Sequence, residues 1–251
     1  MDRVLAFGCH PDDVEFQCSG TLALLRDKGY EIHIATMTGG ELGSLDLPPQ
    51  QIREKRLKEC EASASVIGAH YHYAGGCDVE VEYTCELRRQ TIRVVREVDP
   101  VLVFTLPPMD YMIDHEETSR LVRNAVFIAA VPNYDCGVPT KATGRIPHLY
   151  YWDAISGVDI FGRPLPINRV VNISSVLETK EKMLACHASQ REWLAHISGM
   201  DNYVADMVKN SRRQGEAIGV DAAEGFVQHL GANYPQGNIL KRILGELSLE
   251  I

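Results

Sequence analysis

Short apolar runs alternate with longer amphipathic segments along the first half of the chain, a pattern typical of strands that alternate with helices. The runs that predict strands are residues 4–7 (VLAF), 32–36 (IHIAT), 70–73 (HYHY) and 101–105 (VLVFT). The segments that predict helices are residues 21–25, with an end near Gly29, and residues 50–67, 82–98 and 115–130. Repeated strand–helix–strand units form a mostly parallel, Rossmann-like sheet with helices on both faces, so the predicted fold class is α/β.

The second half of the chain has a weaker pattern. It predicts a strand at residues 169–173, a helix at residues 176–187 and a turn-rich insertion at residues 132–166. The sequence contains no internal repeat, low-complexity tract or linker. We therefore expect a single domain that spans residues 1–251.

Polar clusters follow three of the predicted strands. They occupy residues 10–13, 38–44 and 110–115. In a parallel sheet with helices on both faces, the loops at the carboxyl ends of the strands line the ligand site. We therefore expect these clusters to meet at one edge of the sheet.

Composition narrows the classes of protein that the chain can belong to. Acidic residues outnumber basic ones by 34 to 25, and no cluster of Lys and Arg can follow a phosphate backbone, which argues against nucleic acid as a partner. No apolar run reaches the roughly 18 residues of a membrane span, which argues against a membrane protein. The seven cysteines lack CxxC spacing, as expected for reduced thiols in a cytoplasmic protein.

The cluster at residues 10–13 reads His-Pro-Asp-Asp. Proline favours the first turn of a helix, so we expect His10 just before a helix and Asp12 and Asp13 at its start. One carboxylate can then bind a cation while the other faces the water on that cation; the structural alternative is a pair of acids that complements the helix dipole. The second cluster, Asp114-His115, again lies between a strand and a helix and favours the metal.

Two imidazoles and one carboxylate, completed by water, are the ligands of a three-ligand catalytic zinc site. His10, Asp13 and His115 match this set, and Asp12 remains as the general base for the water. The same donors also suit iron(II), so the sequence leaves the identity of the metal open.

Residues 6–15 (AFGCHPDDVE), followed by residues 19–23 (SGTLA), resemble the signature of the PIG-L/LmbE family of zinc-dependent de-N-acetylases. The family acts on N-acetylglucosaminyl compounds. The likeness extends through residues 38–44, 56–59, 66–68, 100–104 and 114–115 and, more loosely, 187–190 and 223–226. The resemblance implies an LmbE-like fold, zinc, an acetamido-sugar substrate and a homo-oligomer, often a hexamer.

The resemblance also assigns roles by position. It places the metal ligands and the general base on four residues, namely His10, Asp13, His115 and Asp12. It places the family's substrate-binding arginine on Arg56, with Arg53 one turn earlier as the alternative. Glu41 and Ser44, in the loop that precedes this helix, are predicted as further substrate contacts. The structural alternative for both arginines is a solvated helix face that pairs with nearby glutamates.

One position departs from the family pattern. The family often has His-Pro-Asp-His in the second cluster, where the first histidine stabilises the oxyanion or protonates the leaving amine. This chain has Met112 there, and a thioether can do neither. His187 is the predicted replacement donor and Tyr111 the second candidate, although His187 also suits the carboxyl end of a helix. Asp114 is expected to accept a hydrogen bond from the ring N–H of a metal-binding histidine.

These observations predict a zinc-dependent hydrolase that removes an acetyl group from an N-acetylglucosamine-type sugar conjugate. Met112 motivates an alternative from another class, a relative that binds metal and sugar without catalysis. A third class, a nucleotide-binding module, is disfavoured because no glycine-rich phosphate loop follows the first predicted strand.

Overall fold

The structure is a computed structural model that describes residues 1–198 and 202–251. The strands of these residues form one eight-stranded sheet in the order β3-β2-β1-β4-β5-β7-β6-β8. Their bounds are β1 (Arg3–Gly8), β2 (Glu31–Thr38), β3 (His70–Gly76), β4 (Leu102–Thr105), β5 (His148–Trp152), β6 (Arg169–Asn172), β7 (Ala223–Gln228) and β8 (Ser248–Glu250). Strands β1 to β5 pair in parallel, whereas β6, β7 and β8 pair antiparallel. The parallel part has the 3-2-1-4-5 order of a Rossmann sheet.

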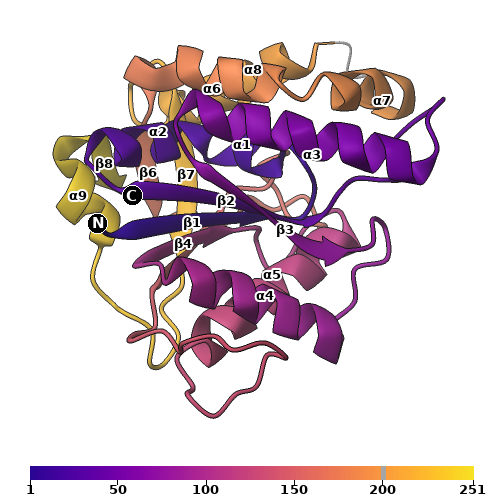
Figure 1. The fold of residues 1–251 in the computed structure, drawn as a ribbon. Helices are drawn as coiled ribbons and strands as arrows, with labels where there is room; N and C mark the ends of the chain where they lie inside the picture. The colour runs from indigo at the N-terminus through magenta and orange to yellow at the C-terminus, as the bar shows by residue number, and fades with distance from the viewer. Residues whose placement is uncertain (199–201) are drawn as a thin grey trace.

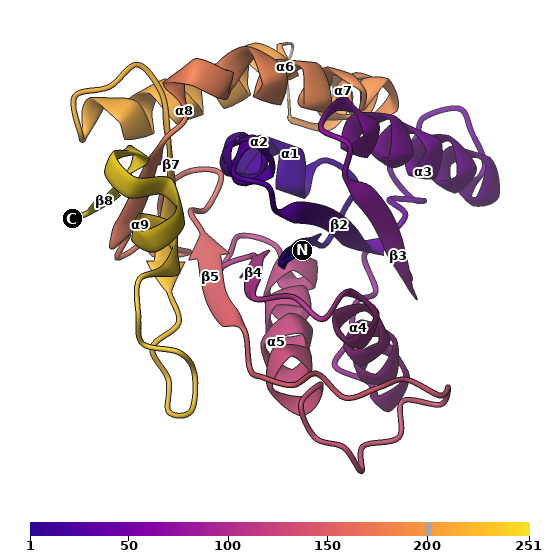
Figure 2. The same cartoon turned by 60° about the vertical axis from the view of Figure 1, so that its left-hand side comes forward.

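Helices cover both faces of this sheet (Figures 1 and 2). Helices α4 (Cys85–Val98) and α5 (Ile113–Ile128) lie on one face. The other helices are α1 (Asp13–Gln17), α2 (Ser19–Asp27), α3 (Pro49–Val66), α6 (Leu177–Ala185), α7 (Ala188–Ser198), α8 (Tyr203–Glu216) and α9 (Ile239–Leu244), with short 3₁₀ turns at Ser174–Val176 and Gly245–Leu247. Helices α1, α2 and α3 lie on the opposite face from α4 and α5, and α6 packs against all three. The predicted α/β class is confirmed.

The central strand β1 shows why the sequence folds this way. It pairs with β2 on one side and β4 on the other, and Val4, Leu5, Ala6 and Phe7 are completely buried. A parallel strand covered by helices on both faces needs a continuous apolar run rather than an alternating one. Within the described residues, no helix combines the length and the apolar character needed to cross a bilayer.

The predicted insertion at residues 132–166 is wrong in one respect, because it contains an inner strand of the sheet. Strand β5 pairs in parallel with β4, and Tyr150 and Trp152 are almost completely buried. Strand β5 has few aliphatic residues. Its aromatic side chains therefore do not form the aliphatic run by which a buried strand is predicted. Strand β7 and helix α8 were not predicted either, whereas the helix predicted at residues 176–187 is confirmed in α6.

The connections that follow two neighbouring strands, β1 and β4, run to opposite faces of the sheet. The chain leaves β1 toward α1 and α2 on one face, and it leaves the neighbouring strand β4 toward α5 on the other face (Figure 2). Such a switch point opens a crevice at the carboxyl ends of the two strands, where ligands bind in open α/β sheets. The first and third polar clusters of the sequence therefore lie beside each other.

Candidate metal centre

The turn between β1 and α1 fixes the first two predicted ligands. The backbone amides of Cys9 and His10 both donate to Asp13 Oδ2, each over 2.8 Å. Asp12 takes a left-handed backbone conformation, with φ 105°, at the start of α1. A residue other than glycine rarely adopts this conformation, which costs on the order of 1–3 kcal/mol and is found mainly where function requires it. The turn therefore holds His10, Asp12 and Asp13 in a fixed arrangement.

The loop between β4 and α5 positions His115 in the first turn of α5. Its Nδ1 lies 3.0 Å from Asp110 Oδ1, so this nitrogen carries the ring proton. Its Nε2 then has a lone pair, and it lies 3.6 Å from Asp13 Oδ1. Burial by itself lowers the pKa of His115, but the carboxylates of Asp13 and Asp110 raise it overall. These surroundings favour a positive charge at Nε2, either a proton or a bound cation.

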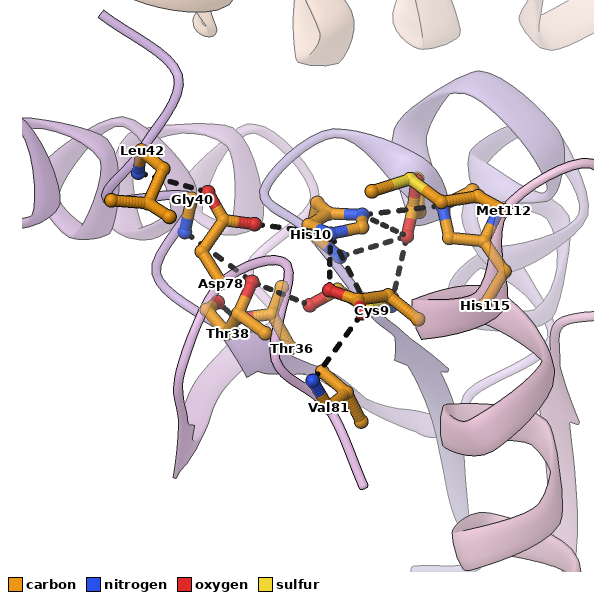
Figure 3. Close-up of polar contacts among 12 residues, drawn as sticks. Cys9, His10, Thr36, Thr38, Gly40, Leu42, Asp78, Val81, Met112 and His115 are labelled. Carbon is orange, nitrogen blue, oxygen red and sulfur yellow. Dashed lines mark hydrogen bonds and ion pairs between the residues drawn. The ribbon is translucent and has the colours of Figure 1, made fainter. Parts of the chain in front are cut away.

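His10 has the same arrangement on its own ring. Its Nε2 lies 3.2 Å from Asp78 Oδ1 and 3.4 Å from Asp114 Oδ2, and its Nδ1 lies 3.2 Å from His115 Nε2. Figure 3 shows the ring between Asp78 on one side and His115 on the other. Carboxylates on the outer nitrogen keep its proton there and leave the inner nitrogen as a metal ligand. Asp114 thus lies beside the ring of His10, where its expected hydrogen bond would form.

Three ligand atoms therefore converge on one point. One atom each from His10, Asp13 and His115 lies within 4.8 Å of the other two, and all three residues are buried. Two nitrogen lone pairs that face each other repel unless a cation lies between them. The donor set of two nitrogens and one oxygen is the set used by catalytic zinc and by non-haem iron(II). The residues present therefore fit a divalent metal ion.

A second group, Cys9, His10 and Asp114, shares His10 with the first. Complete burial raises the pKa of the Cys9 thiol to about 11. Only the thiolate is a good metal ligand, so this group is poorly suited to a metal at neutral pH. The group that contains His115 is the better candidate.

Asp12 lies beside the ligands and has a partner that the sequence did not reveal. The phenol of Tyr203, in the first turn of α8, donates a hydrogen bond to Asp12 Oδ2. Burial, together with the charge of Asp13, raises the pKa of Asp12 to about 7, whereas His187, Tyr203 and Arg56 lower it. A carboxylate with a pKa near neutrality is suited to proton transfer.

His187, the predicted replacement donor, lies behind this turn. It is 1% exposed, and its Nε2 lies 3.2 Å from Glu15 Oε1, which also accepts a hydrogen bond from Ser63. Burial lowers the pKa of His187, but the charges of Glu15 and Asp12 raise it overall. In this conformation the imidazole acts on Asp12 through its charge and presents no donor to an open surface.

The three predicted substrate-binding residues organise the loop between β2 and α3. Arg56 is 2% exposed and donates to the carbonyl oxygens of Gly40 and Gly43 over 2.7 and 2.6 Å. Glu41 accepts hydrogen bonds from the amides of Gly39 and Asp78. The hydroxyl of Ser44 accepts from the amides of residues 46 and 47. These contacts hold the loop against the metal centre, and contact with substrate stays a prediction.

Two residues of the loop between β4 and α5 lie beside the centre. Figure 3 shows the thioether of Met112 beside His10 and His115. The Tyr111 side chain is largely exposed, and its ring lies edge-on to that of His115 with the centroids 5.3 Å apart. Tyr111 is therefore the hydroxyl that this loop presents next to the metal ligands.

Sequence reasoning missed three further residues of the centre. Asp110 was within a cluster that the sequence singled out, but nothing distinguished it from Asp114. Asp78 follows β3, and Tyr203 belongs to a helix that was not predicted. Their contacts join segments separated by up to 191 residues, and no local pattern encodes such a contact.

Comparison with known proteins gives a consistent result. The model of the family described as GlcNAc-PI de-N-acetylase (PIG-L) matches residues 5–126. The diacetylchitobiose deacetylase of Thermococcus kodakarensis is 30% identical over 197 residues, which cover 76% of this chain and 70% of that protein. The 4-oxalmesaconate hydratase of Pseudomonas putida is 24% identical over 194 residues, 74% of this chain and 73% of the hydratase.

A solved structure shows the same likeness in three dimensions. The N,N'-diacetylchitobiose deacetylase from Pyrococcus horikoshii superimposes with a TM-score of 0.77 at 25% identity. The match covers 91% of this chain and 84% of that one. The structural likeness therefore extends well beyond residues 5–126, which the family model matches.

Proposed function

Because the chain belongs to the GlcNAc-PI de-N-acetylase (PIG-L) family, we propose that it is a metal-dependent hydrolase that removes the acetyl group of an N-acetylglucosamine-type sugar. The observation that carries this proposal is the convergence of His10 Nδ1, His115 Nε2 and Asp13, with Asp12 in a strained conformation beside them. The diacetylchitobiose deacetylases of similar sequence and structure support the substrate class.

His10, Asp13 and His115 would hold the metal ion, zinc or iron(II). When bound, the ion supplies a Lewis acid that lowers the pKa of water and polarises a carbonyl oxygen. The chain contributes fixed orientation: Asp110 holds the ring of His115, and Asp78 and Asp114 hold the ring of His10. Such outer carboxylates increase the basicity of the ligands and fix their tautomers.

Asp12 is the proposed general base. Water attacks the acetyl carbon and gives one proton to Asp12 as the new C–O bond forms. The same proton then passes from Asp12 to the sugar nitrogen, the C–N bond breaks, and the amine is released with acetic acid, which keeps the second proton of the water. Tyr203 holds the carboxylate in place through its hydrogen bond, and no further acid is needed to balance the protons.

The carbonyl oxygen gains negative charge during attack and needs a hydrogen-bond donor. Met112 has no proton to give, and His187 is buried behind Asp12. Tyr111 is exposed beside His115, and a phenol keeps its proton at neutral pH. Tyr111 is therefore the residue that we assign to the oxyanion.

A second candidate function follows from Met112 and from the hydratase relative. That protein shares 24% identity over three quarters of this chain, so the fold also accommodates addition of water to an unsaturated acid. The loss of the family's histidine donor is compatible with such a reaction, or with binding of a sugar without catalysis.

A substrate screen with purified protein separates these functions. We expect release of free amine from N-acetylglucosamine, diacetylchitobiose and GlcNAc-inositol conjugates, with loss of activity in a chelator and recovery with zinc or iron(II). Hydration of 4-oxalmesaconate without amine release would assign the second function. Affinity for the sugars without product would assign a binding protein.

The variant Asp12→Ala tests the proposed base. We expect the metal content to stay the same and turnover to fall about 10²- to 10⁴-fold, the usual contribution of a general base. Asp46→Ala, an exposed acid in the loop before α3, is the matched control and should keep full turnover. Unchanged turnover in Asp12→Ala would remove this residue from the mechanism.

A further inference from the structure

A cavity of about 440 Å³ lies between α5, the segment that follows β7 and the loop before α4. None of the proposed metal ligands lines it. Its polar side contains Arg120, Arg123 and His229, and its apolar side contains Tyr83, Phe127 and Tyr234. The described residues that line the cavity include two arginines and no carboxylate, in a chain whose net charge is −9.

Arg123 is the centre of the polar side. In the described part of the chain it forms no ion pair, and its side chain interacts with the phenol of Tyr151. The hydroxyl oxygen of Tyr151 lies 3.0 Å from His229 Nδ1. The positive charge of Arg123 makes the phenol the better donor of this pair, so its proton goes to His229 Nδ1. His229 therefore carries its own proton on Nε2.

The remaining groups extend this set of donors. Burial and the charge of Arg123 lower the pKa of His229, so its ring is neutral and remains an N–H donor. Arg120 stacks over Tyr83, with the guanidinium carbon 4.5 Å from the ring centroid, and pairs with the partly exposed Glu117 at 3.5 Å. The donors on this side of the cavity are therefore Arg123, Arg120 and the N–H of His229. Arg123 has no carboxylate partner among the described residues, and Arg120 has only a weak partner at the surface.

The apolar side is built from aromatic rings. Tyr234 packs edge-on against His229, with centroids 4.1 Å apart, and Phe127 lies 6.1 Å from Tyr234. The hydroxyl of Tyr234 donates to the backbone oxygen of Arg123 and so fixes the ring against α5. Flat aromatic surfaces of this kind bind the face or edge of a planar ring.

We propose that this cavity binds a small anionic molecule whose phosphate or carboxylate contacts Arg123 and Arg120 and whose planar ring packs on Phe127 and Tyr234. The volume lies within the usual range for small-molecule sites. Guanidinium groups bind such oxyanions through paired hydrogen bonds, and the absence of a competing carboxylate leaves Arg123 available. Because His115 and Arg123 lie on the same helix, about 12 Å apart along its axis, the site is separate from the metal centre.

Isothermal titration calorimetry on the metal-loaded protein tests the proposal with phenyl phosphate, benzoate and inorganic phosphate as probes. We expect the two ring-bearing probes to bind more tightly than inorganic phosphate. Arg123→Gln should weaken binding of the preferred probe by at least about tenfold, and Arg123→Lys should weaken it less, since the charge remains. Arg212→Gln removes one exposed charge elsewhere and should change the affinity by less than about twofold.

Each outcome decides the matter once thermal unfolding confirms that the variants fold. A preference for phenyl phosphate or for benzoate identifies the anionic group, and either result supports the site. Binding that is insensitive to Arg123→Gln would place the anion elsewhere, for example on the metal, and would overturn the proposal. Equal losses in Arg123→Gln and Arg212→Gln, or no binding of any probe at millimolar concentration, would overturn it as well.

Discussion

Asp12 combines a left-handed backbone, deep burial and a single phenol partner, and each feature depends on a different part of the chain. The backbone conformation comes from the turn that Asp13 stabilises through the amides of Cys9 and His10. The burial places its pKa near 7, and the phenol of Tyr203 comes from α8. These constraints fix the orientation of the Asp12 carboxylate. A fixed orientation suits a general base that must face a reacting water.

Tyr203→Phe tests the positioning of Asp12 while it keeps the apolar packing of the ring. We expect turnover to fall about 10- to 100-fold, the value of a hydrogen bond to a charged group, with no change in metal content. Because the phenol stabilises the charged carboxylate, its loss raises the pKa of Asp12, and the acid limb of the pH–rate profile should move to higher pH.

The matched control is Tyr71→Phe, which removes the phenol of a half-buried tyrosine that contacts Thr36. It should keep the wild-type turnover and pH profile. A Tyr203→Phe enzyme with wild-type turnover and an unshifted profile would show that the hydrogen bond only stabilises the fold.

Tyr111→Phe tests the assignment of the oxyanion donor. We expect kcat to fall about 10²- to 10³-fold with little change in KM, because the donor acts mainly on the charge that develops during attack. His187→Gln provides the comparison. A full loss in that variant together with wild-type kcat in Tyr111→Phe would assign the donor to His187, as the sequence predicts.

Helix α8 connects the metal centre with the second half of the sheet. Its first turn carries Tyr203, and its last turn carries Arg213 and Gln214, which lie 3.5 and 3.4 Å from Asp153 Oδ2. Asp153 follows β5, and its burial raises its pKa to about 6, although Arg213 opposes the shift. The contact between Asp153 and the last turn of α8 therefore includes a carboxylate whose charged form is destabilised by burial.

The pKa of Asp153 gives stability a defined pH dependence. The folded protein binds the proton of this carboxyl more tightly than the unfolded chain, whose aspartate pKa is about 3.9. Stability must therefore fall as the pH rises from about 4 to about 6, and the loss persists above that range. The size of the loss is on the order of 1–3 kcal/mol.

Asp153→Asn should remove this loss, because the amide keeps the hydrogen-bonding geometry without the charge. At pH 8 we expect the variant to be about 1–3 kcal/mol more stable than the wild type, with the difference vanishing near pH 4, as measured by thermal unfolding across pH. The control is Asp221→Asn, which removes an exposed acid that pairs with Arg212 of α8. This variant should show no such difference in stability at pH 8. A wild-type pH dependence in Asp153→Asn would refute the assignment.

At the scale of the whole molecule, strands β1 to β4 and β6 could be predicted from the sequence, whereas β5, β7 and β8 could not. The strands β1, β2, β3 and β4 are short apolar runs separated by amphipathic helices, so the local pattern is sufficient. Strand β5 carries aromatic residues in place of aliphatic ones, and the pairing of β7 with both β5 and β6 depends on contacts between distant segments. Oligomerisation and cytoplasmic location stay predictions from the sequence.

The candidate centre divides in the same way. His10 and Asp13 follow β1, and His115 follows β4. The sequence predicts both strands, so the meeting of these residues at one edge follows from the topology. Asp78 and Tyr203 join the centre through tertiary contacts, and the burial of Arg56 and His187 depends on packing that the sequence does not encode locally. Sequence therefore predicts which atoms meet at the centre better than it predicts what holds them.

The metal content of the purified protein tests the central claim most directly. Elemental analysis of protein prepared without chelator should find about one zinc or iron ion per chain, and His115→Ala should lose almost all of it. His148→Ala, which removes a histidine at the start of β5, should retain the wild-type content. A wild-type protein without metal, or full occupancy in His115→Ala, would contradict the assignment of these three side chains as the metal ligands.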